Sequence, residues 1–304
     1  MRVSTGMIYN QGVSSIQERT ADLLRLQQQV STGRRILVPS DDPVAAARAL
    51  ETTQAQSVND QFQINQGAAS DALGLYENKL AAVEDLIIHI RTRAVEAGNG
   101  AFSREELGYI ATDLRGQFDA LLAVANSQDG NGEYMFAGYK GDTEPFSASV
   151  GGAVSYAGDQ GERTIQVSSS RIMPVSNSGD EVFMRIDGAT ADMFTMISDF
   201  ITALENPAAS VPTAVSTVIG NMDNALDNVL RVRASVGSRM NEVEALGNVA
   251  SDLSVQYSET LSRLQDVDYA QAVSDLTLEK TYLEAAQQSF LRISQLSLFN
   301  YLGG

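Results

Sequence analysis

The chain of 304 residues contains no cysteine and no tryptophan. The absence of cysteine excludes disulfide bonds, thiolate chemistry and thiolate metal sites. No run approaches the ~20 apolar residues that a membrane-spanning helix needs, so we expect no membrane insertion. The first twenty residues also lack the apolar core and the cleavage site of a secretory signal. We therefore expect that export, if it occurs, uses another route.

Basic residues are far fewer than acidic ones, with 21 Lys and Arg against 38 Asp and Glu, and the net charge is −17. No basic patch is present to overcome this field, which argues against nucleic-acid binding. The charge is also uneven: residues 1–40 carry +3, whereas residues 251–304 carry −4. Opposite signs favour pairing of the two ends. Exposed ion pairs contribute only ~0–1 kcal/mol each, so we expect these charges to set register at most.

Histidine is almost absent, and His89 is the single one. It lies on the flank of an apolar helical stripe and offers neither a catalytic triad nor a multi-histidine metal site. Asp129, Asn131 and Glu133 alternate like the start of a calcium loop. Tyr134 stands where that loop needs glycine, and Lys140 stands at its twelfth position, so turn chemistry explains these residues better. We expect no catalytic site, no cofactor and no metal.

Both ends of the chain carry one-sided apolar patterns that are typical of coiled-coil helices. The N-terminal stripe consists of Tyr9, Ile16, Leu23 and Val30. The C-terminal stripe consists of Tyr269, Ala272, Leu276, Leu283, Ala286, Phe290 and Ile293, with polar Glu279 as its one interruption. A helix with such a stripe is stable in water only when the stripe is covered. We therefore predict that residues 1–40 and 260–304 pair as a terminal coiled-coil assembly domain.

The predicted assembly interface is formed by apolar positions of both stripes. These positions are Tyr9, Ile16, Leu23, Val30, Tyr269, Leu276, Leu283, Phe290 and Ile293. The protein's own core is expected elsewhere, so these stripes are interpreted as contacts to neighbouring subunits.

The middle of the chain predicts a helical bundle from residues 41–130 together with 189–259. Asp42 before Pro43 is a helix start, and Ser103 with Glu106 forms a capping box. Heptads over 73–94, 107–125 and 215–267 are interpreted as intramolecular core. The longest tract has ~55 residues and would reach ~80 Å at 1.5 Å per residue, so we expect an elongated molecule.

Residues 131–188 predict a β-rich outer domain, because glycine is frequent and short alternating runs replace the helical period. Thr164–Val167 and Tyr134–Ala137 are two such runs. A segment of ~60 residues without disulfides or metal is near the lower limit for independent folding. We therefore expect it to pack on the helical part.

Several blocks of this sequence resemble the flagellin superfamily and, more closely, the hook-associated protein 3 family of bacterial flagella. The blocks are MRVSTGMIYNQ at the start, STGRRILVPSDDPVAA from residue 31, DGNGEYMFAGYK from residue 129, YAGDQGERTIQV from residue 156, RASVGSRMNE from residue 233, and DVDYAQAVSDLTLEKTYLEAAQQSFLRISQLSLFNYL from residue 266. Flagellins share the second and fifth blocks. The third block and the SLF-NYL ending are the ones that are typical of the junction family.

This resemblance implies a mainly α-helical, discontinuous, multi-domain fold with a β-rich insertion. It further implies an extracellular, non-enzymatic structural subunit at the hook–filament junction. Such a subunit would form a ring with copies of itself and contact an adjacent junction protein and flagellin. It would be secreted through the flagellar type III apparatus with the help of an export chaperone.

Two alternatives stay open at this point. A short flagellin would build the filament itself, although the 129–140 block and the chain ending argue against it. A surface-binding module in residues 131–188 would recognise a glycan or a host protein. Tyr134, Tyr139 and Tyr156 would be its first candidates, although they are interpreted more simply as core of the insertion.

Overall fold

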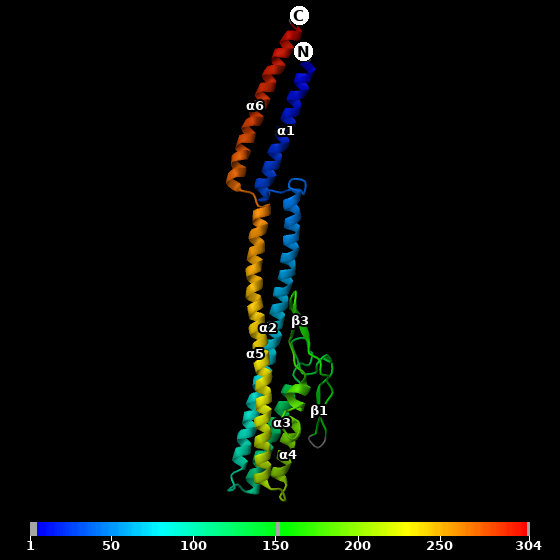
Figure 1. Ribbon diagram of the computed structural model, residues 1–304, viewed down its shortest axis with the longest axis vertical. Helices are drawn as coiled ribbons and strands as arrows, with labels where there is room; N and C mark the ends of the chain where they lie inside the picture. Colours follow the sequence, from blue (N-terminus) through cyan, green and yellow to red (C-terminus); the bar gives the residue numbers. More distant parts are fainter. Residues whose placement is uncertain (1–4, 150–152, 303–304) are drawn as a thin grey trace. The chain divides into compact units, whose positions relative to one another are not determined.

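The computed structural model describes residues 5–149 and 153–302, and within these ranges side chains are described at residue 7 and from residue 9 to residue 292. The six α-helices of the described chain are α1 Thr5–Thr32, α2 Pro43–Ala97, α3 Arg104–Ala125, α4 Met193–Glu205, α5 Val211–Gln265 and α6 Tyr269–Leu302 (Figure 1). The chain divides into two compact units. We call Met1–Val58 with Leu253–Gly304 the arm unit, and Asn59–Asp252 the bundle unit.

The predicted helix starts are confirmed by their caps. Asp42 Oδ1 accepts a hydrogen bond of 3.0 Å from the backbone N–H of Ala45, and Pro43 is the first residue of α2. Ser103 and Glu106 form the predicted reciprocal capping box at the start of α3. These side chains bind backbone N–H groups that have no partner within the helix, so they fix where each helix begins.

The core of the bundle unit is built from the predicted heptads, and their interpretation as intramolecular core is confirmed over 73–94, 107–125 and 215–243. The end of the last tract is only half-buried, at Leu253, Tyr257, Leu264 and Val267. The stripe of α2 is fully buried and consists of Leu73, Tyr76, Leu80, Val83, Ile87, Ile90 and Ala94. It packs in one cluster with buried residues of α3, α4 and α5. Burial of one such large aliphatic side chain contributes about 1.5–3 kcal/mol. This core therefore holds the helices of the bundle unit together without help from another molecule.

The β-rich segment forms two small antiparallel sheets. β1 Phe146–Ala148 pairs with β2 Val154–Tyr156, and β3 Thr164–Ser168 pairs with β4 Arg171–Pro174. The strand predicted over 164–167 is confirmed. The strand predicted over Tyr134–Ala137 is wrong, because only Tyr134 makes a bridge, to Gln128, and turns follow.

Aromatic packing explains why residues 134–137 turn instead of extending. The ring of Phe136 is fully buried, 5.0 Å from the ring of Tyr76 and 5.1 Å from that of Phe183. Gly138 follows with φ of 71°, a backbone conformation that suits glycine and ends the run. Tertiary burial of one ring therefore overrides the local alternation of polar and apolar residues.

The β-rich segment packs on the helices, as predicted, and side chains of α2 donate hydrogen bonds to its backbone carbonyls. The hydroxyl of Tyr76 donates to the carbonyl of Asn177 at 2.9 Å. Asn65 and Gln66 donate to the carbonyls of Gln166 and Val167 at 2.7 and 2.8 Å. The bundle unit thus includes the β-rich segment, and the division of the chain into three domains stays a prediction.

We predict that Ser103→Ala lowers the free energy of unfolding of the bundle unit by about 1 kcal/mol, because the capping box of α3 is lost. Urea unfolding followed by circular dichroism measures this effect. Thr112→Ala, on the exposed face of the same helix, is the matched control and should change stability by less than about 0.5 kcal/mol. An equal loss in both variants would contradict the role of the cap.

Candidate assembly interface

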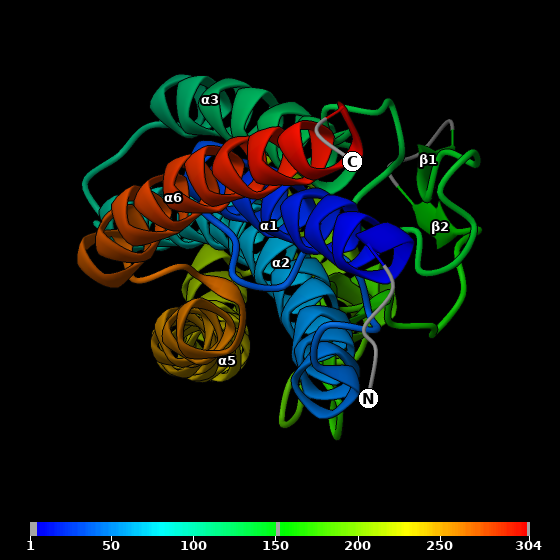
Figure 2. The ribbon, with the colours of Figure 1, turned by 90° about the horizontal axis from the view of Figure 1, so that it is seen from above.

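Helices α1 and α6 of the arm unit lie side by side and run antiparallel, with the two chain ends at the same end of the pair (Figures 1 and 2). At that end the rings of Tyr9 and Phe290 are 5.1 Å apart. At the other end the backbone N–H of Val267 donates to the carbonyl of Gly33 at 2.9 Å, and that of Arg35 donates to the carbonyl of Gln265 at 2.7 Å. Helix pairing thus follows the whole length of α1.

The predicted apolar positions differ in how far this pairing covers them. Those that are half-buried are Ile16, Leu23 and Val30 of α1 and Leu276, Leu283 and Phe290 of α6. Tyr9 and Tyr269 remain 54% and 55% exposed, and the side chain of Ile293 lies outside the described ones. Ala272 is buried, at 4% exposure. The structure brings the two stripes together, and their role in contacts between subunits stays a prediction.

Glu279, the polar interruption of the C-terminal stripe, has a partner that the sequence pattern did not predict. Arg19 Nη1 donates to its two carboxylate oxygens at 3.0 and 3.2 Å, and the guanidinium carbon lies 5.4 Å from the centre of the Tyr282 ring. The hydrogen bond to Glu279 and the charge of its carboxylate raise the pKa of Arg19. Since both charges must meet at one level of the pair, this contact fixes its register.

Two glycines lie where the backbone comes close to side chains of α6: Gly12 within α1, and Gly33 directly after its last residue. A Cβ atom on Gly12 would lie 2.6 Å from Cδ2 of Phe290, and one on Gly33 would lie 2.9 Å from the hydroxyl of Tyr269. Gly33 also has φ of 71°. Gly12, Arg19 and Gly33 alternate with the predicted stripe at a spacing of three and four residues. These three residues therefore form a second row of contacts with α6, beside the apolar stripe. The spacing of three and four residues was the signal by which the sequence could have identified this row.

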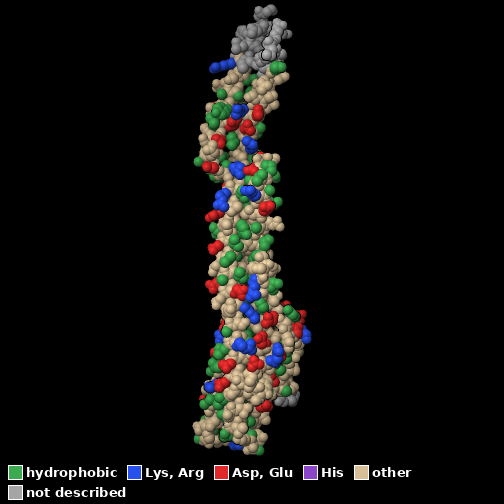
Figure 3. Space-filling model, viewed as in Figure 1, with side chains coloured by type: hydrophobic (Ala, Val, Ile, Leu, Met, Phe, Trp, Pro, Cys, Tyr) green, Lys and Arg blue, Asp and Glu red, His purple; other side chains and the backbone are tan. Residues whose placement is uncertain are grey.

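The arm unit leaves much apolar surface exposed (Figure 3). Large hydrophobic side chains that remain exposed in it include Leu24, Val38, Val44, Leu50, Val58, Val255, Val273, Leu278 and Tyr282. Exposed apolar side chains of this kind, where they adjoin, are typical of interaction sites in soluble proteins. Association of the arm unit through this surface stays a prediction.

The described residues offer no arrangement for metal binding. No group of three or more His, Cys, Asp or Glu side chains among them could hold a metal ion. His89 Nε2 lies 3.1 Å from Asp113 Oδ2, and this hydrogen bond lowers the pKa of Asp113. Asp129 Oδ1 accepts hydrogen bonds from the backbone N–H groups of Asn131 and Glu133, which confirms the predicted turn. No helix in the described ranges combines the length and hydropathy of a membrane span.

The three candidate tyrosines of a surface-binding module have different surroundings. The hydroxyl of Tyr156 donates to the carbonyls of Phe136 and Asp159 at 2.9 and 2.7 Å, and partial burial raises the pKa of Tyr156 to about 12. Tyr134 is half-buried, whereas Tyr139 is exposed. Tyr156 is therefore part of the packing of the insertion, and the three hydroxyls do not share one surface role.

Comparison with known proteins agrees with this geometry. Residues 3–141 match the family model for the bacterial flagellin N-terminal helical region, and residues 219–302 match that for the bacterial flagellin C-terminal helical region. The fold and its paired ends thus define a structural protein of flagellin type. A crystal structure of flagellar hook-associated protein 3 from Legionella pneumophila has the same fold, with a TM-score of 0.66 and 21% identity over 70% of this chain and 98% of that chain.

Curated relatives identify the family within this class. Flagellar hook-associated protein 3 of Escherichia coli is 36% identical over 98% of this chain and 99% of the relative. Flagellar hook-associated protein 3 of Salmonella typhimurium is 35% identical over the same shares, 98% and 99%. The chain belongs to the flagellar hook-associated protein 3 family, whose members are structural proteins of the flagellum.

We predict that Arg19→Glu and Glu279→Arg each impair incorporation of the chain into flagella, because each leaves two like charges facing each other in the pair. The double variant should restore incorporation, since the two charges are then exchanged. Quantifying the chain in purified flagella measures this. Arg25→Glu, the same charge change at an exposed position of α1, is the control and should incorporate normally. Failure of the double variant to recover would show that the ion pair does not set the register.

Proposed function

We propose that this chain is a structural subunit that joins the flagellar hook to the filament, and that its two terminal helices carry the contacts of assembly. The observation that carries this proposal is the half-buried seam between α1 and α6. A pair of helices covers only one face of each helix, and the remaining apolar surface of the arm unit needs further copies to be removed from water.

The proposed partners follow from the family. They are a ring of copies of this chain, an adjacent hook–filament junction protein, and flagellin. An export chaperone and the flagellar type III secretion apparatus would bring the chain to the extracellular end of the hook without a cleavable signal peptide. No enzymatic activity and no cofactor belong to this proposal.

Membership of the hook-associated protein 3 family supports a place at the hook–filament junction rather than along the filament. Relatives at 35–36% identity over nearly the whole chain are hook-associated proteins, and the alternative of a short flagellin has no comparable support. A tagged chain viewed by immunogold microscopy should label only the boundary between hook and filament. Label along the whole filament would contradict the proposed place.

We predict that the double variant Leu283→Asp with Phe290→Asp abolishes incorporation into flagella, because two charges then enter the seam between α1 and α6. The free variant should keep the bundle unit folded, since both residues lie in the arm unit. Circular dichroism of the free chain and motility of cells that depend on the variant measure the two effects.

The matched control is Thr281→Asp with Gln288→Asp, which adds the same charge at exposed positions of α6. It should assemble. Wild-type motility of the Leu283 and Phe290 variant would contradict the proposed role of the seam, and equal failure of both pairs would show only sensitivity to charge on α6.

A further inference from the structure

Within the arm unit, the α1–α6 pair joins the long helices α2 and α5 through two connections, residues 33–42 and 266–268. The two connections lie side by side, because Arg34 and Asp266 form an antiparallel bridge with backbone hydrogen bonds on both sides of it. We call this place the crossing. The pair is therefore attached to both long helices at a single level of the arm unit.

The side chain of Arg35 reaches both long helices at the crossing. Its Nη2 donates to the carbonyl of Leu264 in the last turn of α5 at 2.8 Å, and its Nη1 donates to Oδ2 of Asp42, the residue before α2, at 3.4 Å. The carbonyl of Arg35 accepts a hydrogen bond of 2.6 Å from Nε2 of Gln29 in the last turn of α1. Arg35 thus contacts the ends of α1, α2 and α5 at one point.

These contacts use groups that the helices themselves leave free. The carbonyl of Leu264 belongs to the last turn of α5, whose carbonyls have no N–H partner within the helix, and a cation is favoured at this end of the helix dipole. The backbone N–H of Ala45 and, less strongly, the hydrogen bond from Arg35 lower the pKa of Asp42, so Arg35 faces a carboxylate. A planar guanidinium holds its two Nη atoms in fixed directions, so binding both groups at once favours one geometry.

The neighbouring arginine, Arg34, differs from Arg35 in its side chain. Arg34 takes part in the backbone bridge, but its side chain is exposed and its guanidinium has no hydrogen bond or ion pair within the described part of the chain. The contacts with α2 and α5 therefore belong to the guanidinium of Arg35 and are not shared by both basic residues.

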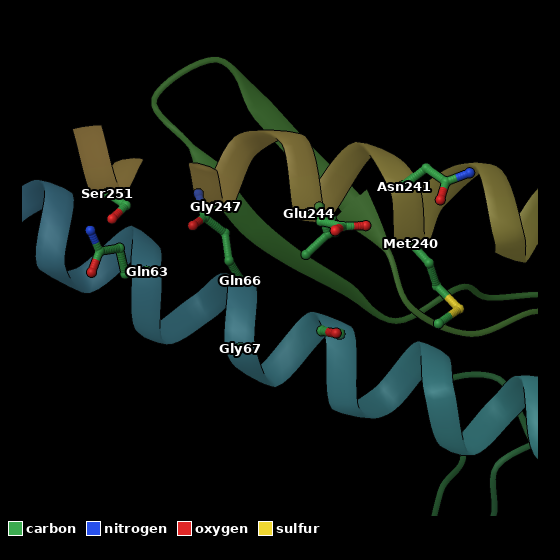
Figure 4. A pocket seen from close by; sticks show the side chains of 10 residues that line it. Gln63, Gln66, Gly67, Met240, Asn241, Glu244, Gly247 and Ser251 are labelled. Carbon is green, nitrogen blue, oxygen red and sulfur yellow. The ribbon is translucent and has the colours of Figure 1, made fainter. Parts of the chain in front are cut away.

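Farther from the crossing, in the bundle unit, α2 and α5 meet at separate points. Asn59 Nδ2 of α2 donates to the carbonyl of Ala250 at 2.8 Å. Next to this contact a groove of about 470 Å³ separates the two helices, and Gln66 extends from α2 toward Gly247 of α5 (Figure 4). Close packing is what transmits alignment through a protein, and this stretch lacks a continuous seam. Contacts at the crossing are thus the ones that act directly on the α1–α6 pair.

We propose that Arg35 is a positioning residue that sets the direction in which the α1–α6 pair leaves the ends of α2 and α5, and so presents the arms in the orientation in which they assemble. The second half rests on the proposed function, since it presupposes that the arms carry the contacts of assembly. Without the guanidinium, the backbone bridge still joins the two connections, and Arg19 and Glu279 still hold α1 to α6. Its loss should free the direction of the pair and leave the pair itself intact.

Distances between pairs of spin labels test the direction of the arms in the free chain, which has no cysteine of its own. Labels on Gln17→Cys of α1 and Gln256→Cys of α5 span the crossing, whereas labels on Gln17→Cys and Gln288→Cys span the α1–α6 pair; all three positions are exposed. Arg35→Ala should broaden the distance distribution across the crossing and leave the distribution within the pair unchanged. Arg34→Ala is the matched control and should change neither.

An unchanged distribution across the crossing in Arg35→Ala would overturn the proposal. Loss of the distance within the pair would also overturn it, because Arg35 would then be required for the pairing of α1 with α6 rather than for the direction of the pair.

The amount of each variant in purified flagella tests the second half of the proposal. Arg35→Ala should be incorporated several-fold less than Arg34→Ala, which should match the unsubstituted chain. Equal incorporation of the two variants, despite a broadened distribution in Arg35→Ala, would show that assembly does not need the direction of the arms and would overturn this half. Absence of the unsubstituted chain from flagella would contradict the proposed function and leave the distance result standing.

Discussion

Two antiparallel helices can remove from water only the faces that they turn toward each other. This geometry limits how much apolar surface the arm unit can bury by itself. α1 and α6 bring their apolar stripes together, yet most stripe residues stay half-buried and both end tyrosines stay more than half exposed. In the proposed assembly, association with further helices would remove the rest of this surface from water. On this proposal the stability of the arms is tied to assembly, because the pairing of α1 with α6 leaves their outer faces uncovered.

The bundle unit has the opposite character. Its stripes on α2, α3, α4 and α5 are closed around one core. The β-rich insertion is joined to that core by the rings of Phe136, which contacts Tyr76 of α2, and Phe183, which contacts Phe194 of α4. α2 and α5 each run for 55 residues, so each contributes to both units within one continuous helix. The same helices thus carry a core that the chain closes by itself and an arm unit with exposed apolar surface. This arrangement suits a subunit whose bundle unit folds before the subunit is assembled.

Local signals in the sequence were enough to predict the helices. The caps at Asp42 and Ser103 depend on residues three positions apart, and the heptad from Leu73 to Ala94 depends on spacing along one helix. Pairing of the two ends was predictable from their stripes. The partner of Glu279 was not, because Arg19 lies 260 residues away and only the register of the pair brings them together.

The remaining misses have the same origin in long-range packing. Tyr134–Ala137 alternates like a strand, but burial of Phe136 against Tyr76 makes it turn. The groove at Gln66 is formed by residues of α2 and α5 that are far apart in the sequence, and no local pattern marks it. Features that depend on residue spacing within one helix or strand can therefore be predicted from the sequence. Contacts between elements that are distant in the sequence can be identified only from the structure.

Amide hydrogen exchange, measured on the free chain and on the same chain in purified flagella, tests the central claim most directly. The account predicts that amides of α1 and α6 exchange much more slowly after assembly, while core amides of α2 and α3 are already protected in the free chain. Equal, strong protection of α1 and α6 in both states would contradict it, because the arms would then be stable without other copies.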